Sequence, residues 1–267
     1  VQFKSIFWWE YGHRLWGRLI GFAYAVPLVW FLVRRRIPRG LAWPLVGIFA
    51  LGACQGALGW YMVESGLVHR VEVSQYRLTA HLLLALAIYA ATLWVALGLL
   101  RGAAQAGPAP GWRRASEGVL GLVAVTIAAG GFTAGLNAGL IYNTFPLMGG
   151  HLVPGDYAAL TPFFRNWFEN PAAAQFDHRV LAMTTAAAVV VVWLAGRRAA
   201  LPRAACLALH VLLFAVALQV SLGISTLLLV VPIPLAAAHQ AGAVLLLTMA
   251  VVLRHTLRAT TPTAPDP

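Results

Sequence analysis

The chain has 267 residues, of which 60% are hydrophobic and only 10% are charged. A soluble domain is about 45–50% apolar and about 25% charged, so this composition predicts an integral membrane protein and excludes a soluble enzyme or binding domain. The net charge of +11 would suit a nucleic-acid-binding protein, but the basic residues lie between apolar segments, which excludes nucleic acid as the partner. The two cysteines, Cys54 and Cys206, lie far apart in apolar segments and indicate neither a disulfide framework nor a zinc or iron–sulfur site.

Seven segments are apolar over the roughly 20 residues that a helix needs to cross a bilayer, which predicts an all-α membrane fold. The first of them is free of charge only from Leu19 onward and contains Pro27. Loops rich in arginine alternate with loops that are not, so we expect the arginine-rich side to be cytoplasmic. On the opposite side, the aromatic residues and prolines of the long loop from Asn137 to Ala174 predict an ordered cap. The predicted spans are residues 14–33, 42–62, 76–100, 117–136, 176–196, 203–229 and 235–255.

Four of the eight histidines share a placement along the chain. His13, His81, His178 and His239 lie near the beginning of the first, third, fifth and seventh spans, and these spans all run from the outer face inward. We therefore expect the four imidazoles to lie at a similar depth near the outer face. The remaining histidines share no such placement, and we expect only solvation or local hydrogen bonds from them: His69, His151, His210 and His255.

An internal repeat relates the two halves of the chain. The segment HRLWGR at His13 corresponds to HRVLAM at His178, QGALG corresponds to QVSLG, and TAHLLLALA corresponds to AAHQAGAVL. This repeat predicts two four-helix bundles related by an approximate twofold axis along the membrane normal, in residues 1–100 and 117–258, with a cytoplasmic linker at 101–116. The second bundle has a span ahead of its first histidine, so we expect an eighth helix, the first of the fold, to precede the sequence given.

Polar side chains inside a membrane are candidates for function. A single histidine often only bonds across two helices, but a repeated pair at one depth favours a ligand. Zinc requires three or four close ligands per site, so one histidine pair per bundle favours haem iron held between two imidazoles. Arg14 and Arg179, each directly after a histidine, suit haem propionates, although interfacial snorkelling explains them equally well. A small residue four positions after each histidine leaves room for a flat ring: Gly17, Ala85, Ala182 and Ala243.

The two halves differ at one informative position. Glu10 lies three residues before His13, whereas Gln175 lies three residues before His178. The first half therefore has an ionisable group within one helical turn of its histidine, and the second half has the neutral counterpart. If both bundles hold haem, the carboxylate indicates chemistry in the first half and passive electron transfer in the second. A capping or interfacial role near the helix start is the alternative for Glu10.

Four motifs of the chain resemble the haem A synthase family, in its alphaproteobacterial and mitochondrial type. They are FKSIFWWEYGHRLWGRLIG, AGLNAGLIYNTFPLMGG, QFDHRVLA and AAHQAGA, they occur in this order, and the resemblance covers essentially the whole chain. Some bacterial members carry a cysteine pair in outer loops, and this sequence has no cysteine there. The resemblance implies eight transmembrane helices in two halves, in agreement with the repeat.

The resemblance also implies an oxidoreductase that oxidises a methyl group of haem O to the formyl group of haem A, which serves cytochrome c oxidase. His13 and His81 would then flank the iron of the substrate haem, with Glu10 as the essential acidic residue, while His178 and His239 would ligate haem b. The expected location is the bacterial inner membrane rather than the mitochondrial one, with the histidine sites toward the periplasm. The expected partners are haem O synthase and cytochrome c oxidase assembly proteins.

Two other functions remain open from the residues alone. A cytochrome b-type quinol or electron carrier also pairs histidines between helices, but it would stack two haems across the membrane, and here the four histidines share one level. A haem transporter is also compatible with several spans and an internal repeat. It would need polar residues at mid-depth, where these spans are almost free of charge.

Overall fold

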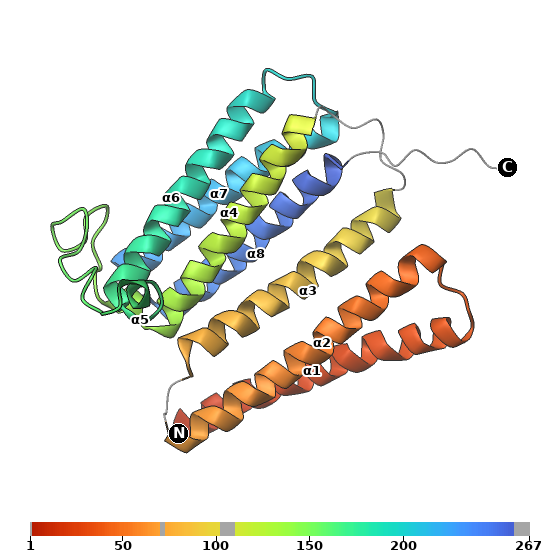
Figure 1. The fold of residues 1–267 in the computed structure, drawn as a ribbon, viewed down its shortest axis with the longest axis horizontal. Helices are drawn as coiled ribbons and strands as arrows, with labels where there is room; N and C mark the ends of the chain where they lie inside the picture. Colours follow the sequence, from red (N-terminus) through yellow and green to blue (C-terminus); the bar gives the residue numbers. More distant parts are fainter. Residues whose placement is uncertain (1, 70–72, 102–109, 259–267) are drawn as a thin grey trace.

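The computed structural model describes residues 2–69, 73–101 and 110–258. Seven helices in these ranges are long and apolar enough to cross a membrane, which confirms the predicted all-α multi-pass membrane protein (Figure 1). Half of the predicted linker at 101–116, residues 102–109, lies outside the described residues, and helix α4 already begins at Pro110. The side chain of His69 and any helix before the first residue also lie outside the described residues. The long helices are α1 (Gln2–Val33), α2 (Arg39–His69), α3 (Gln75–Arg101), α4 (Pro110–Gly135), α6 (Pro171–Gly196), α7 (Arg203–Leu228) and α8 (Ile233–Thr256).

Helix α1 extends far beyond the span predicted at 14–33. It begins at Gln2, and the part that is apolar enough to cross a membrane begins at Phe7. The basic residues Arg14 and Arg18 do not end it, because arginine is a good helix former. Its main neighbour is α2, and many of its tryptophan side chains are exposed along its whole length. This helix is therefore the least enclosed of the seven.

The most enclosed part of the described chain is formed by α4, α6, α7 and α8. Each of these helices contacts two of the others, in the cyclic order α4, α6, α7, α8 and back to α4. Their inward faces supply most of the buried apolar residues, including Val123, Val189, Leu212 and Leu247. Such burial is worth about 1.5–3 kcal/mol per large aliphatic side chain in water, but in lipid the association rests on close packing. The twofold relation between two bundles and the proposed domain limits stay predictions.

Helix α3 joins the two halves of the chain by packing against α4 and α8. Two glycines of α4 allow the approach: a Cβ at Gly131 would lie 2.9 Å from Oγ1 of Thr79, and a Cβ at Gly135 would lie 2.7 Å from Cα of Gln75. Small residues at such crossings let helix backbones come close, which is a main source of helix association in membranes. The first half of the chain thus meets the second along α3.

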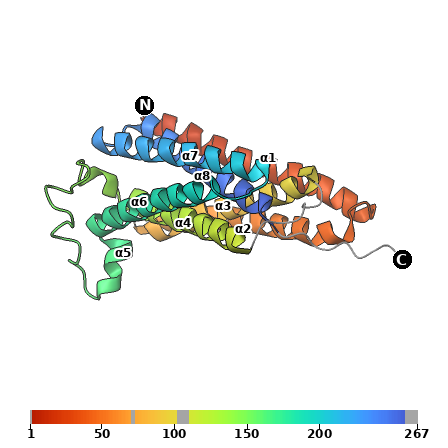
Figure 2. The ribbon, with the colours of Figure 1, turned by 90° about the horizontal axis from the view of Figure 1, so that it is seen from above.

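The loop between α4 and α6 folds into an ordered cap, as its composition predicted. Figure 2 shows this loop and the short helix α5 (Asn166–Glu169) projecting at one end of the long helices. Asn166 is fully buried, and its amide donates to the carbonyl oxygens of Leu160 at 2.9 Å and Phe163 at 2.8 Å. The loop also contains two 3-10 turns, η1 (Ala138–Leu140) and η2 (Phe163–Arg165). Buried amides therefore hold together a loop that would otherwise be long and open.

The same loop is fastened to α3. The hydroxyl of Tyr76 donates to Oε1 of Glu169 at 3.0 Å, and the amide of Gln75 donates to the carbonyl of Phe168 at 3.3 Å. The ring of Tyr76 also packs edge-on against Phe132, with 5.7 Å between ring centroids. The cap that belongs to the second half in sequence therefore also touches the first half.

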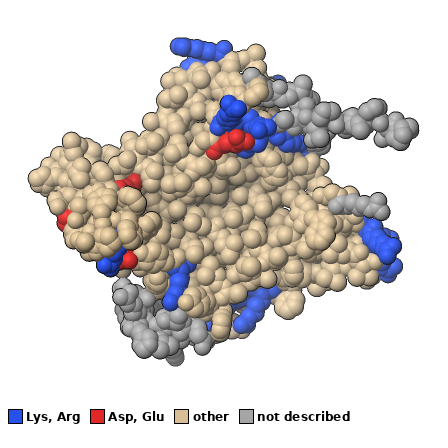
Figure 3. Space-filling model, in the orientation of Figure 1, with Lys and Arg blue, Asp and Glu red and all other residues tan. Residues whose placement is uncertain are grey.

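The surface is apolar over most of its area. Figure 3 shows that acidic side chains are few on the face in view and that most of this face is neither acidic nor basic. Near the arginine-rich end, Arg254 pairs with Glu117 at 2.8 Å, and Arg101 donates to the hydroxyl of Thr256 at 2.8 Å. A wide apolar belt between charged ends is the surface expected of a protein that spans a bilayer.

Replacing Asn170 by Ala should destabilise the protein by about 2–4 kcal/mol. The Asn170 amide donates to the carbonyls of Asp156 and Tyr157 and to the side-chain oxygen of Asn166, and its own oxygen accepts from the backbone of Ala172 as the cap of α6. The melting temperature of the purified protein in detergent measures the loss. Asn170→Ser keeps a capping oxygen but removes the amide donors, so it should lose less than Asn170→Ala, and equal losses in the two variants would show that the capping oxygen contributes nothing.

The contact between α5 and α3 should survive mild acid. Hydrogen bonds from Arg165 and Tyr76 hold the pKa of Glu169 below its ordinary value of 4.5. A carboxyl group with a lowered pKa stabilises the folded state while it is ionised. This stabilisation is lost only as the pH falls through the lowered pKa. Hydrogen exchange over 163–169, referenced to α7, should therefore stay slow at pH 4.5 and rise below it. In Glu169→Gln the pH dependence should vanish, and loosening of the wild-type loop already above pH 4.5 would contradict the assignment.

Candidate functional site

The structure brings two of the predicted histidines together in the second half. His178 of α6 and His239 of α8 have ring centroids 6.5 Å apart, with ring planes nearly perpendicular at 83°. Each lies six or seven residues after the first residue of its helix, which is about 10 Å along the axis. The two imidazoles therefore share one depth, as the sequence predicted for this pair.

Each of these rings lies against a glycine of a neighbouring helix. A Cβ at Gly130 of α4 would be 3.0 Å from Cε1 of His178, and a Cβ at Gly223 of α7 would be 2.9 Å from Cε1 of His239. These distances are shorter than ordinary van der Waals contact, so only glycine leaves the rings where they are. The pair is thus set between α4 and α7, with α6 and α8 supplying the histidines.

The ring nitrogens of this pair have different partners. Nδ1 of His178 lies 3.1 Å from the carbonyl oxygen of Thr126, which can only accept, so Nδ1 carries the proton and Nε2 has a free lone pair. Nδ1 of His239 is buried and has no hydrogen-bond partner within the described residues. Within the described residues, Nε2 of neither histidine makes a hydrogen bond.

This geometry fits two imidazoles on opposite sides of one metal ion. A metal–nitrogen bond is about 2 Å long and the ring centre lies about 1 Å beyond the nitrogen, so a bis-imidazole pair has centroids about 6 Å apart. The observed 6.5 Å is close to that value. Across the described chain, no three His, Cys, Asp or Glu side chains come together as a metal-binding group. What the arrangement offers is a pair of axial ligands for a flat metal complex.

The first half holds its histidines differently. His81 of α3 also lies against a glycine, since a Cβ at Gly59 of α2 would be 3.0 Å from its Cε1. The amide nitrogen of Gln55 lies 3.2 Å from Nε2 of His81 and donates to the carbonyl of His81 at 3.1 Å. His13 of α1 is exposed and lies within electrostatic range of His81. The pairing of His13 with His81 therefore stays a prediction, and Nε2 of His81 already has a partner in Gln55.

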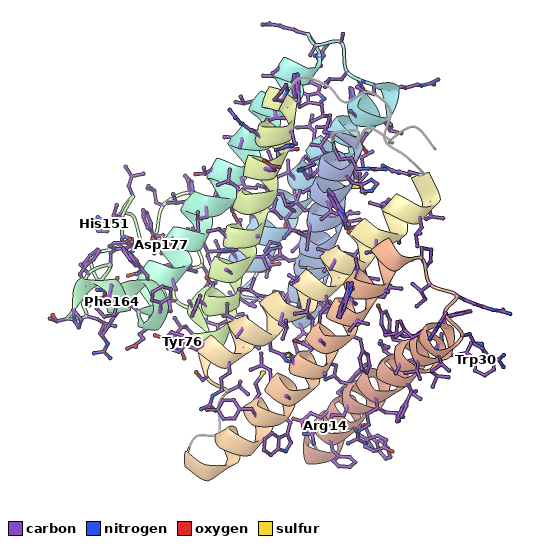
Figure 4. The ribbon with its side chains drawn as sticks, turned by 45° about the vertical axis from the view of Figure 1, so that its right-hand side comes forward. Arg14, Trp30, Tyr76, His151, Phe164 and Asp177 are labelled. Carbon is purple, nitrogen blue, oxygen red and sulfur yellow. The ribbon has the colours of Figure 1, made fainter. Side chains whose placement is uncertain are left out.

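The predicted acidic residue forms an ion pair on α1. Oε2 of Glu10 lies 3.1 Å from Nη2 of Arg14, and both side chains are about half exposed. An exposed pair of this kind contributes about 0–1 kcal/mol to stability. Figure 4 shows Arg14 toward the same end of the helices as Tyr76 and Asp177, whereas Trp30 lies at the other end of α1. A carboxylate therefore stands one turn from His13, open to its surroundings.

The corresponding residues of the second half are closed in by the cap. Arg179 donates to the carbonyl oxygens of Tyr142 at 2.7 Å and Thr144 at 2.8 Å, and the amide of Gln175 donates to the same Tyr142 carbonyl at 3.2 Å. Gln175 is only 2% exposed. Arg179 therefore anchors the loop through two of its nitrogens, and its predicted contact with a propionate stays a prediction.

The other histidines were expected to show only solvation or local hydrogen bonds, which holds for His210 but not for His255, whose buried ring packs against Trp94 of α3. Nδ1 of His210 lies 2.7 Å from the carbonyl of Cys206, and the backbone of His151 forms a bridge with Met148. His255 is buried against the ring of Trp94 and contacts Arg258. The two cysteines are free thiols.

Sequence reasoning missed the groups that hold the rings. Gly59 and Gly223 each lie four residues after a glutamine in the repeated segments QGALG and QVSLG, so a signal for them was present in the repeat. Gly130 and the carbonyl of Thr126 belong to no recognisable motif. The small residues that the sequence singled out lie on the same helices as the histidines, whereas the glycines that contact the rings lie on neighbouring helices. At Gly17, one of the residues singled out, a built Cβ would meet no atom within 4 Å.

Comparison with known proteins decides the family. Residues 1–251 match the COX15-CtaA family, described as Cytochrome oxidase assembly protein. This chain belongs to that family. The resemblance inferred from the four motifs is thereby confirmed.

Relatives with curated names support the same placement. The "Heme A synthase" of Nitrosospira multiformis is 54% identical over 260 residues, which are 96% of this chain and 73% of that protein. The "Heme A synthase" of Rhodospirillum centenum is 51% identical over 96% of this chain and 69% of its own length. The human "Heme A synthase COX15" is 45% identical over 97% of this chain and 65% of its own length. Family members thus occur in bacteria and in animals.

Proposed function

We propose that this protein oxidises a methyl group of haem O to the formyl group of haem A, with a second haem, haem b, as an electron relay. Relatives that are 45–54% identical carry the name heme A synthase, and at this identity the chain is an oxidoreductase enzyme. The observation that carries the proposal is the imidazole pair of His178 and His239. Its spacing suits a bis-histidine haem, and its Nε2 atoms are without partners in the described chain.

In this proposal the second half holds haem b permanently. His178 and His239 supply the axial nitrogens, and Thr126 fixes the orientation of one of them through its carbonyl. The ordered loop closes the outer end, because Arg179 and Gln175 tie it to α6. Such enclosure excludes water and keeps a cofactor in place.

The first half takes haem O as its substrate, between His13 and His81. When bound, a haem supplies the redox chemistry, and the protein supplies position and charge. Gly12, Gly17 and Gly21 of α1 carry no side chain, and a Cβ built at any of them would meet no atom of the described chain within 4 Å, which suits contact with a flat ring and its farnesyl tail.

Glu10 acts as the acidic group of the reaction. Its carboxylate accepts a proton at Oε as the methyl group loses hydrogen, or stabilises the positive charge that develops as electrons leave the ring. Arg14, 3.1 Å away, orients the carboxylate. Gln175 at the matching position of the second half cannot ionise, so that half is restricted to carrying electrons.

The protein is embedded in a membrane, and the proposal places it in the bacterial inner membrane with both histidine sites toward the periplasm. The arginine-rich ends of α1, α6 and α8 would then face the cytoplasm, as the positive-inside rule requires. Family membership links the chain to cytochrome oxidase assembly. The partners are haem O synthase, which supplies the farnesylated substrate, and cytochrome c oxidase assembly proteins, which receive the product.

Pigments extracted from the purified protein should separate the candidate functions. Haem b together with haem O or haem A is the result expected of the synthase. Haem b alone would favour a cytochrome b-type electron carrier, and protein without haem would favour a transporter. His178→Ala and His239→Ala should each remove haem b, whereas His13→Ala and His81→Ala should each remove haem O and haem A but retain haem b.

Glu10→Gln should keep both haem sites assembled and lower conversion by at least about 100-fold, the scale of a lost acid–base group. The measurement is the ratio of haem A to haem O in cells and in the purified variant. Glu117→Gln is the matched control, because Glu117 pairs with Arg113 and Arg254 at the opposite end of the helices. Normal conversion by Glu10→Gln would exclude the proposed role.

A further inference from the structure

The three most enclosed histidines of the predicted sites contact glycine in the same way. Cε1 of each ring points at a glycine of an adjacent helix, and a Cβ there would lie 2.9–3.0 Å away: Gly59 for His81, Gly130 for His178 and Gly223 for His239. The three contacts occur on three different helix pairs, α2 with α3, α4 with α6, and α7 with α8. A contact that recurs in both halves indicates a common role rather than local packing.

The glycine fixes where the ring nitrogen points. An imidazole ring rotates about its bond to Cβ, so a group that pushes Cε1 away also turns the adjacent Nε2 away from the direction in which it would bind a metal. Two axial ligands must aim at one point between them, and each has little freedom because the metal–nitrogen distance is short. Any side chain at the glycine would force such a swing, since 3.0 Å is closer than real Cβ atoms ordinarily come.

We propose that Gly59, Gly130 and Gly223 are positioning residues that set the aim of the axial imidazoles, each for the haem of its own half. This inference rests on the proposed function. Gly130 and Gly223 act on haem b, because their rings are His178 and His239, which face each other. Gly59 acts on the substrate haem through His81.

The backbone one turn before Gly130 supports this role. Thr126 lies four residues before Gly130, and its carbonyl oxygen accepts a hydrogen bond from Nδ1 of His178. The absence of a side chain at the glycine lets the ring approach the carbonyl of the preceding turn. Second-shell acceptors of this kind orient metal-binding histidines. At His178, glycine and carbonyl together thus determine the depth and the rotation of the ring.

Alanine substitutions test the inference because alanine favours a helix more than glycine does, so the helix itself is not weakened. Gly130→Ala and Gly223→Ala should each lower haem b per protein at least twofold. The haem b that remains should shift from a low-spin six-coordinate spectrum toward a high-spin one. Gly59→Ala should keep haem b with its wild-type spectrum and lower haem O plus haem A at least twofold.

Glycines on the same helices serve as matched controls. A Cβ at Gly56 of α2 or at Gly121 of α4 would meet no atom within 4 Å, so Gly56→Ala and Gly121→Ala should keep both haems. The haem of the unaltered half reports that each variant is folded.

If all three variants kept the haem content and spectra of the wild type, the inference would be overturned but the proposed function would stand. Equal loss of both haems in Gly59→Ala would overturn the assignment of each glycine to its own half. A wild-type protein purified without any haem would instead overturn the proposed function, and this inference with it.

Discussion

The structure of the site depends on the close approach of helix backbones beside the imidazoles. A membrane interior contains no water, so polar side chains must find their partners within the protein. Gly130 and Gly223 let His178 and His239 lie directly against neighbouring backbones, where the carbonyl of Thr126 satisfies one ring nitrogen. The alternating direction of the helices then places both rings at one depth. At His178, the close packing against Gly130 is therefore also what brings the ring nitrogen to its hydrogen-bond acceptor.

The same sequence positions serve different purposes in the two halves. In the second half, Gln175 and Arg179 bind the carbonyl of Tyr142 and close the outer end with an ordered loop. In the first half, the matching Glu10 and Arg14 bind each other and remain about half exposed. Under the proposed function, the half with the ordered loop retains a cofactor, and the half with the carboxylate acts on a substrate. The two halves of the repeat thus differ in a loop and in one carboxyl group.

The apolar pattern of the sequence was sufficient for the membrane class and the seven spans, because lipid requires long uninterrupted helices. The repeat also predicted the depth shared by His178 and His239. It could not reveal Gly130 or the Thr126 carbonyl, because contacts between helices depend on their rotation and crossing, which a linear pattern does not determine. The partners of Arg179 were missed for a similar reason, since they are backbone oxygens of a loop whose path is set by buried amides such as Asn166.

The amide nitrogen of Gln55 lies 3.2 Å from Nε2 of His81. In the second half, Gln219 instead lies against Gly242, three residues after His239, where the first half has the bulkier Leu84. Under the proposed function, Nε2 of His81 would have to give up the hydrogen bond with Gln55 in order to hold an iron. A tetrapyrrole without a metal could not compensate for the lost hydrogen bond. The first site would therefore select for tetrapyrroles whose metal binds imidazole.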